Sequence, residues 1–211
     1  RLFDDRTVHA IALTVSEDGL ESLAVDRRTE VPASVQIRGV WFPEVGVRLK
    51  GQIGSRRRLD QKAAWKVDLN EYEGHSIYGQ EMLTVNNMVQ DPSYVAEHLA
   101  YSVYRAAGIP APRTSWARLS VNGEDWGLYS LIETVDDNFL GRWFVDPDGR
   151  MWEGKYGQDF VDGDIMALDF DQGVDDDRST LLAVSDILSG PADAEAIIEL
   201  ERYVALDQWL L

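Results

Sequence analysis

The side chains best suited to chemistry in this sequence surround a glycine-containing loop between residues 48 and 66. Gly51 and Gly54 let the backbone approach a ligand closely, and the Ser55 hydroxyl and nearby backbone N–H groups can donate hydrogen bonds to it. The stretch has one acid, Asp60, and seven basic residues: Arg48, Lys50, Arg56, Arg57, Arg58, Lys62 and Lys66. Phosphate groups are bound by this combination of glycines, donors and cations. The stretch therefore predicts a phosphate-binding loop, with a tight turn carrying solvated arginines as the competing interpretation.

The loop differs from the two best-known phosphate motifs. It lacks the Gly-x-x-x-x-Gly-Lys-Ser/Thr pattern, and a strand rather than a helix is expected after it. It also lacks the Gly-x-Gly-x-x-Gly pattern of protein kinases. The spacing alone therefore predicts phosphate chemistry without naming a class of enzyme.

A lysine-to-glutamate order follows the loop. Hydrophobic alternation predicts a strand over residues 63–69, and a helix is expected over residues 91–108. Protein kinases pair a lysine on the strand after their glycine loop with a glutamate on the next helix, which orients the lysine on the nucleotide phosphates. Lys62 and Lys66 precede Glu97 in this order. The two lysines would lie roughly 13 Å apart on one face of the strand, so both cannot contact the same phosphate.

The expected helix has clear boundaries and two faces. Asp91-Pro92 is a candidate cap with proline at the first helical position, and Gly108 is a natural stop. Its apolar stripe comprises Val95, Leu99, Val103 and Ala106. Glu97, Tyr101 and Tyr104 fall on another side. Glu97 could thus face a polar site, and the alternative is a surface acid on an amphipathic helix.

The composition excludes several classes of function. A net charge of -17 argues against non-specific binding of nucleic acid, which needs a broad basic face. The chain has no cysteine, and its three histidines are too scattered to predict a zinc site. No apolar run approaches the roughly 20 residues of a membrane span. The sequence starts at Arg1 rather than methionine, which leaves export open.

The remaining elements follow from hydrophobic patterns. Short antiparallel strands are expected in the first half, and Asn122-Gly123 predicts a two-residue hairpin turn. Helices are expected over residues 179–188 and from Ala194 onward. The last of these ends on the uncapped apolar run Trp209-Leu210-Leu211, so we expect the native polypeptide to continue. The chain is predicted to be one folded unit with an internal lobe boundary near residue 134.

The last third of the chain is acidic. Residues 144–211 contain seventeen acids against four bases. Four aspartates could hold a hard cation through their oxygens: Asp162, Asp164, Asp169 and Asp171. A solvated acidic surface is the favoured interpretation, and a calcium-binding domain over residues 159–177 is the alternative.

A series of further motifs runs in order from about residue 3 to residue 155. They are Val-Gly-Val-Arg-Leu-Lys-Gly at 45–51, Ser55, Lys62, Leu-Thr-Val-Asn-Asn-Met-Val-Gln-Asp-Pro-Ser at 83–93, Glu97, Gly-Ile-Pro-Ala-Pro-Arg at 108–113, Val-Asn-Gly at 121–123, Trp-Gly-Leu-Tyr at 126–129, Glu133 and Phe139-Leu140. This order resembles the CotH kinase family, which is named for a bacterial spore-coat protein. The ordered match is far more specific than any one of its motifs.

The resemblance implies an α+β fold of the atypical protein-kinase type. Residues 1–134 would form a mainly antiparallel β N-lobe with one αC-like helix that binds nucleotide, and residues 135–211 the hinge and the incomplete helical start of a C-lobe. The resemblance also implies ATP with Mg²⁺ or Mn²⁺, and phosphoryl transfer to serine or threonine of a protein substrate. It favours an extracytoplasmic location, at a cell or spore surface, and leaves the oligomeric state unpredicted.

Carried over residue by residue, the resemblance assigns catalytic roles to Lys62, Lys66 and Glu97 and assigns no metal ligand. Its nucleotide-binding residues are Arg48, Lys50, Gly51, Gly54, Ser55, Arg56 and Glu133, the last expected near the hinge. Lys62 matches the family position better, whereas Lys66 is better placed within the predicted strand. Both lysines therefore stay candidates.

The departure from the family pattern concerns the catalytic acids. A protein kinase also needs an aspartate as base and an aspartate for the metal, and in this family both lie in a later segment. Asp169-Phe170-Asp171 is only superficially similar to the kinase Asp-Phe-Gly. We therefore expect this chain to be inactive alone, and a non-catalytic, pseudokinase-like surface, coat or adhesion module is the competing hypothesis.

Overall fold

The computed structural model describes residues 1–4 and 6–209 and divides the chain into two compact units. The first unit is Arg1–Arg142 and the second is Trp143–Leu211. The assignment of residues 1–134 and 135–211 as kinase lobes stays a prediction. The terminal residues Leu210 and Leu211, on which the expectation of a longer polypeptide rests, lie outside the described residues.

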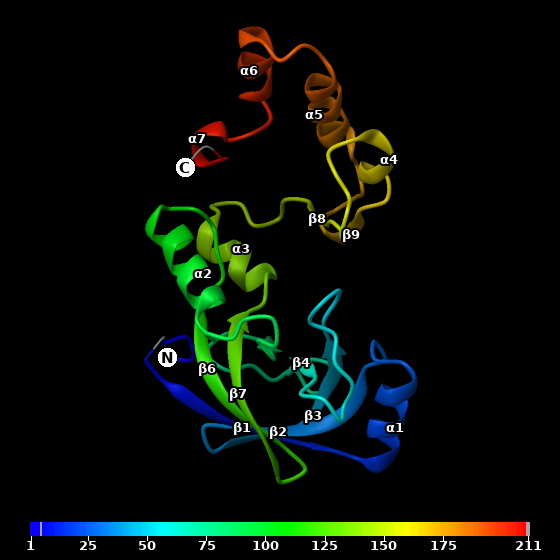
Figure 1. The fold of residues 1–211 in the computed structure, drawn as a ribbon, viewed down its shortest axis with the longest axis vertical. Coiled ribbons are helices and arrows are strands. Elements are labelled where there is room, and N and C mark those ends of the chain that lie inside the picture. Colours follow the sequence, from blue (N-terminus) through cyan, green and yellow to red (C-terminus); the bar gives the residue numbers. More distant parts are fainter. Residues whose placement is uncertain (5, 210–211) are drawn as a thin grey trace. The chain divides into compact units, whose positions relative to one another are not determined.

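The first unit is built on a closed barrel of seven strands among the residues described (Figure 1). The strands are β1 (Val8–Val15), β2 (Val31–Ile37), β3 (Val40–Lys50), β4 (Ala64–Asp68), β5 (Met82–Asn86), β6 (Thr114–Val121) and β7 (Glu124–Glu133). Their order around the barrel is β1-β2-β3-β4-β5-β7-β6. The α+β class and the mainly antiparallel pairing are confirmed. The closure was not predicted, and it occurs through parallel pairing of β1 with β6.

The barrel interior is a continuous apolar core. Its centre is Trp65, which is fully buried and lies 5.7 Å from Trp126 between ring centroids. Alternate residues of neighbouring strands fill the rest, among them Ile11, Leu13, Val35, Val47, Leu49, Val67, Leu83, Val85, Leu119 and Leu131. Because side chains alternate along a strand, the residues between them point outward. Closure also leaves no unpaired sheet edge.

The predicted hairpin between β6 and β7 is confirmed. Val121 pairs with Glu124, and the two residues between them, Asn122 and Gly123, have φ of 50° and 85°. Both angles lie in the left-handed region that this turn type requires. The Asn122 side chain also donates to the Val15 carbonyl and accepts from the Val15 N–H, which joins the turn to β1.

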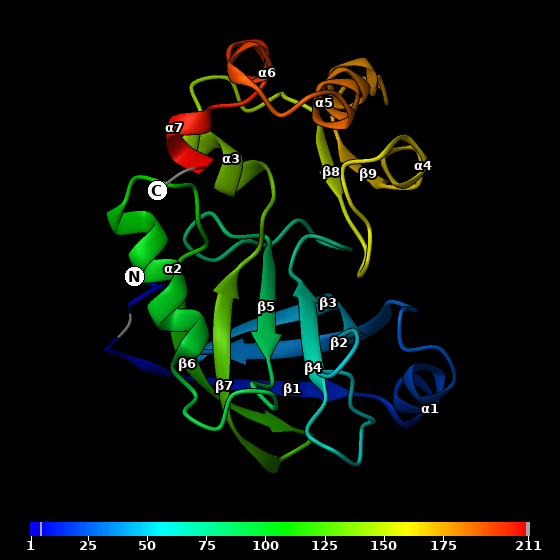
Figure 2. The same ribbon diagram turned by 45° about the horizontal axis from the view of Figure 1, so that its top comes forward.

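Two helices of the first unit lie on different sides of the barrel, α1 (Glu17–Val25) and α2 (Ala96–Ala106), as Figure 2 shows. Helix α1 was not predicted. The available signal was Ser16, whose hydroxyl caps the helix by accepting from the Gly19 N–H at 3.1 Å, followed by two acids in the first turn. A third helix, α3 (Asp137–Trp143), follows β7.

Helix α2 begins later than predicted, at Ala96 instead of Pro92. The Asp91 carboxylate accepts hydrogen bonds from the Ser93 and Ala96 N–H groups, at 2.9 and 2.8 Å. Tyr94 has φ of 62°, which no helical residue adopts. The aspartate therefore stabilises a turn before the helix, and the helix starts only after that turn.

The face of α2 that is buried is not the apolar face that the sequence pattern favours. The side chains of its apolar stripe are largely exposed, at 47% for Val95, 61% for Leu99 and 57% for Val103. The buried residue is His98, whose ring stacks on Trp116 of β6 at 3.7 Å between centroids. The polar face of α2 thus packs on the barrel. Glu97 precedes the buried His98 and is therefore held close to the barrel as well.

The second unit contains a two-stranded sheet and short helices. Its elements are β8 (Met151–Glu153), α4 (Asp162–Ile165), β9 (Asp169–Gln172), α5 (Ser179–Ser189), α6 (Ala194–Leu200) and α7 (Leu206–Trp209). The predicted helix over residues 179–188 is confirmed by α5. The single long helix from Ala194 is wrong, because turns at residues 201–203 separate α6 from α7. Among the described residues, no helix is long and apolar enough to cross a membrane.

Candidate functional site

Basic side chains gather on the outer face of β3 and β4. Leu49 and Trp65 point into the barrel, so Arg48, Lys50 and Lys66 point outward by strand alternation. Arg48 is the register partner of Lys66. We call Arg48, Lys50 and Lys66 the basic face. Lys66 therefore points away from the buried Trp65.

Glu97 of α2 lies within electrostatic range of Lys50, one residue of this basic face. Its Oε1 accepts a hydrogen bond from Asn86 Nδ2 of β5 at 2.6 Å, and its Oε2 is buried. Burial raises the pKa of the Glu97 carboxyl, and the positive charge of Lys50 opposes this rise. The structure therefore brings Lys50 into electrostatic contact with Glu97 and adds it to the candidate partners of this acid.

The raised pKa of Glu97 predicts a specific pH dependence. The folded protein holds the Glu97 proton more tightly than the unfolded chain, so this stabilisation is complete below the ordinary pKa of 4.5 and is lost as the pH rises through the folded pKa. Glu97→Gln removes the ionisation. The free energy of unfolding, measured by urea titration at a series of pH values, should therefore change in favour of the variant. We expect the difference, variant minus original protein, to increase as the pH rises through the folded pKa of Glu97. A difference that stays constant with pH would contradict this account.

Lys62 does not lie on the strand, so that prediction is wrong. It precedes β4 and has φ of 36°, which turns the chain before the strand begins. Its Nζ lies 4.7 Å from the centre of the Tyr94 ring and 5.0 Å from that of Tyr129, as in cation–π contacts. Lys62 and Lys66 therefore do not share one face of a strand.

The glycine loop has the backbone conformations that its sequence indicates. Gly51 and Gly54 have φ of 114° and 84°, in the region that favours glycine. Arg27 donates to the carbonyl of Gly51 at 2.5 Å and also to that of Lys50. The Ser55 hydroxyl accepts from the Gln52 N–H at 3.2 Å. The space over Gly54 is occupied, because an added Cβ would lie 2.1 Å from Gln90 Nε2. A phosphate at Gly54 would therefore require the Gln90 side chain to move.

Asn87 is a loop-holding residue to which sequence analysis assigned no role. It is fully buried, and its Nδ2 donates to the carbonyls of Ser55 and Lys62, at 3.0 and 2.9 Å. It thus joins two ends of the loop to the end of β5. The signal in the sequence was a pair of consecutive amides, Asn86-Asn87, directly after a predicted apolar strand.

We expect Asn87→Asp to loosen this loop. The carboxylate cannot donate to the two carbonyl oxygens that the amide serves, so both carbonyls lose their partner. The free energy of unfolding should fall by about 1–2 kcal/mol, and amide hydrogen exchange should rise over residues 51–62. The matched control is Asn122→Asp, at a different loop of the same unit. Equal rates of amide hydrogen exchange over residues 51–62 in the two variants would contradict this role of Asn87.

Glu133 at the end of β7 has no exposed side-chain surface. Arg113 contacts its Oε1 through Nη2 at 2.5 Å and its Oε2 through the backbone N–H at 2.9 Å. Arg142 of α3 also pairs with Oε2. These contacts brace β7 against the segment before β6 and against α3. A direct contact of Glu133 with a nucleotide stays a prediction.

Three of the four acidic residues proposed as a cation site in the last third have other partners. Asp162 accepts from the Ser185 hydroxyl at 2.7 Å, Asp164 accepts from the Asp159 N–H at 3.0 Å, and Asp169 pairs with Lys155 at 2.7 Å. These observations give no support to a calcium site over residues 159–177.

A different group of carboxylates does come together in the first unit. Glu30, Asp68 and Glu71 each offer an oxygen within 4.8 Å of the others, and no second such group occurs over residues 1–4 and 6–209. Burial, Asp68 and Glu71 raise the pKa of Glu30, while Arg48 and Lys66 lower it. The group therefore lies within electrostatic range of the basic face. The sequence alone does not indicate this group, because Glu30 is 38 residues before Asp68.

Comparison with known proteins identifies the family. The model of the family described as CotH kinase protein matches residues 47–210. An inner spore coat protein H-like protein of Bacillus subtilis is 31% identical over 79 residues, 37% of this chain and 24% of the relative. Invasin CotH2 of Rhizopus delemar is 21% identical over 126 residues, 57% of this chain and 20% of the relative. Inner spore coat protein H of Bacillus subtilis is 25% identical over 89 residues, 42% of this chain and 24% of the relative.

The chain therefore spans at most about a quarter of the length of these curated relatives. The family match is much longer and includes the glycine loop, the basic residues after it and Glu97. The resemblance inferred from the ordered motifs is thereby confirmed, and the chain belongs to the CotH kinase protein family.

Proposed function

We propose that this chain is the nucleotide-binding part of a CotH-type protein kinase. The complete protein would use ATP with Mg²⁺ or Mn²⁺ to phosphorylate serine or threonine residues of a protein substrate. The observation that supports this proposal best is the position of Glu97. It is a half-buried acid on a helix, within electrostatic range of Lys50, one of the cations of the basic face.

The residues present fit the phosphates of a nucleotide. The basic face offers two ammonium groups and a guanidinium, and the buried Oε2 of Glu97 can accept a hydrogen bond from an ammonium group. Arg48 lies only 4.0 Å from Glu30, so part of its charge is already balanced. Lys50 and Lys66 carry the ammonium groups of this face, and Lys50 lies within electrostatic range of Glu97, so we propose both as contacts for phosphate.

Within this proposal the chain's own residues have separate roles. Lys66 and Lys50 neutralise phosphate charge, and Glu97 fixes the direction of one of these ammonium groups. The loop of residues 51–63 covers the phosphates and is held by Asn87 and Arg27. Bound ATP supplies the phosphoryl group. We assign neither the catalytic base nor a metal ligand to these residues.

A titration of the chain with Mg-ATP tests the proposal. We expect saturable binding that weakens about tenfold in Lys66→Ala, because one charged contact to phosphate is lost. Lys155→Ala removes the same charge in the second unit, where Lys155 pairs with Asp169, and should leave binding unchanged. No binding by this chain or by the longest natural polypeptide that contains it would overturn the proposal, and so would equal binding by Lys66→Ala.

A second candidate function is a non-catalytic module at a cell surface or coat. Two observations favour it: the exposed apolar stripe of α2, and relatives that carry the names spore coat protein and invasin. Radiolabelled transfer from ATP to the protein itself or to a general acceptor would exclude this alternative. Both candidates are compatible with a location at a cell or spore surface.

A further inference from the structure

A concave pocket lies between the end of α1 and the loop of residues 51–63. Its volume is about 530 Å³, within the range of small-molecule pockets. Leu23 and Leu49 contribute an apolar part. Its charged part contains four arginines, Arg27, Arg56, Arg57 and Arg58, and one acid, Asp60. We call this site the arginine pocket.

The charge of the arginine pocket is poorly balanced. Its one acid, Asp60, pairs with Arg58 at 3.1 Å. Arg27 and Arg57 donate to backbone carbonyls of the loop. Within residues 1–4 and 6–209, no carboxylate forms an ion pair with Arg27, Arg56 or Arg57. Burial and then the charge of Arg56 lower the pKa of Arg27, so the guanidinium groups repel each other. An anion in the pocket would relieve this repulsion.

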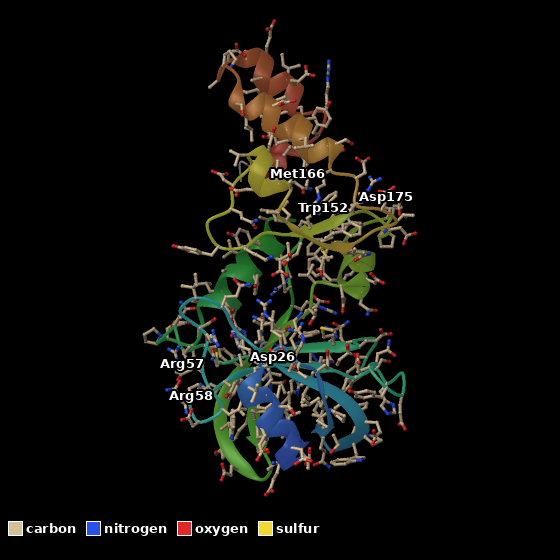
Figure 3. All side chains as sticks on the ribbon, turned by 90° about the vertical axis from the view of Figure 1, so that its right-hand side faces the viewer. Asp26, Arg57, Arg58, Trp152, Met166 and Asp175 are labelled. Atoms are coloured by element: carbon tan, nitrogen blue, oxygen red, sulfur yellow. The ribbon has the colours of Figure 1, made fainter. Side chains whose placement is uncertain are left out.

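The arginine pocket is separate from the basic face. Leu49, which lines the pocket, points into the barrel, whereas the neighbouring Lys50 points outward. The pocket adjoins α1, while Glu97 belongs to α2 on another side of the barrel (Figure 2). Figure 3 shows Arg57 and Arg58 beside one another on the loop. Arg56, assigned above to the nucleotide, therefore lines a second site.

We propose that the arginine pocket binds a phosphomonoester, apart from the nucleotide that the basic face would hold. Guanidinium groups bind the oxygens of a phosphate dianion in paired, charge-assisted hydrogen bonds. The apolar part of the pocket leaves room for the group that carries the phosphate. Two sources share this chemistry, a phosphorylated serine or threonine of a peptide and a free phosphorylated small molecule. The proposal goes beyond phosphoryl transfer and does not require it.

Calorimetric titration of the 211-residue chain tests the proposal with three probes: a phosphoserine peptide, the same peptide without phosphate, and glycerol phosphate. We expect the phosphorylated peptide or glycerol phosphate to bind and the unphosphorylated peptide not to bind. The double variant Arg56→Gln/Arg58→Gln should weaken binding about tenfold or more. Arg28→Gln, an exposed arginine next to Arg27 that does not line the pocket, should weaken it less than twofold by comparison. Urea midpoints of all variants verify that the fold is retained.

The outcomes separate this site from the proposed nucleotide site. Lys66→Ala should leave phosphomonoester binding unchanged, and saturating Mg-ATP should not compete with it. Tighter binding of the peptide identifies a phosphorylated protein as the source, and tighter binding of glycerol phosphate identifies a small molecule. Absence of binding by both phosphorylated probes overturns the proposal. The proposal is also overturned if the double variant and Arg28→Gln lose the same affinity for the phosphorylated probes, or if Mg-ATP competes with these probes.

Discussion

Glu133→Ala should lower the free energy of unfolding of the first unit by about 3 kcal/mol. Removal of this buried carboxylate leaves the guanidinium groups of Arg113 and Arg142 without their shared partner. The cost lies at the lower end of the range for broken buried pairs, because the arginine side chains are 38% and 28% exposed and can turn toward water. Urea titration followed by amide exchange in β6 and β7 measures the change.

Two control variants separate charge from packing at Glu133. Glu133→Gln keeps the shape of the side chain but loses the charge, and should cost less than the alanine variant. Glu124→Ala removes an exposed acid from the start of the same strand and should change stability by less than about 0.5 kcal/mol. If Glu133→Ala were no more destabilising than Glu124→Ala, the contacts of Glu133 with Arg113 and Arg142 would not contribute to stability.

Lys66→Ala should reduce phosphoryl transfer about 100-fold in the longest natural polypeptide that contains this chain. This expectation rests on the proposed kinase activity, in which a positioned cation stabilises charge on the phosphates during transfer. Lys66 lies on the outer face of β4, among the other residues of the basic face. Initial rates of radiolabel transfer at saturating Mg-ATP measure the effect.

Lys62→Ala decides between the two lysines that the sequence left open. Lys62 lies over the rings of Tyr94 and Tyr129, so its loss should disturb the loop and change transfer by less than about tenfold. Lys62→Arg should restore the ring contacts and most of this loss. A larger effect at Lys62 than at Lys66 would contradict our assignment of the phosphate contact.

Local patterns in the sequence predicted part of this fold correctly. Alternation predicted the strand of residues 63–69, in which Trp65, Val67 and Leu69 are buried, and Asn122-Gly123 predicted the hairpin. These features depend on neighbouring residues alone. The parallel pairing of β1 with β6 joins segments more than 100 residues apart, as Val8 with Trp116, and no local pattern encodes that contact.

The predictions about α2 and the loop were incomplete because tertiary contacts of side chains determine these segments. Side-chain hydrogen bonds of Asp91 replaced the first turn of the expected helix, and those of Asn87 hold the loop through contacts that no periodic pattern encodes. The stacking of His98 on Trp116 turned the polar face of α2 toward the barrel, against its amphipathic pattern. Periodicity describes only how residues share a face, and tertiary contacts decide which face is buried.

The closure of the barrel by β1 and β6 has a consequence during synthesis. β1 leaves the ribosome before β6, because its partner Trp116 is made 108 residues after Val8. At translation rates of about 5–20 residues per second, roughly 5–20 s pass between the synthesis of β1 and that of its partner β6, and the barrel cannot close earlier. Throughout that interval one edge of β1 remains unpaired and open to pairing with other nascent chains. A chaperone that shields β1 should therefore increase the yield of folded protein more than one that acts after release.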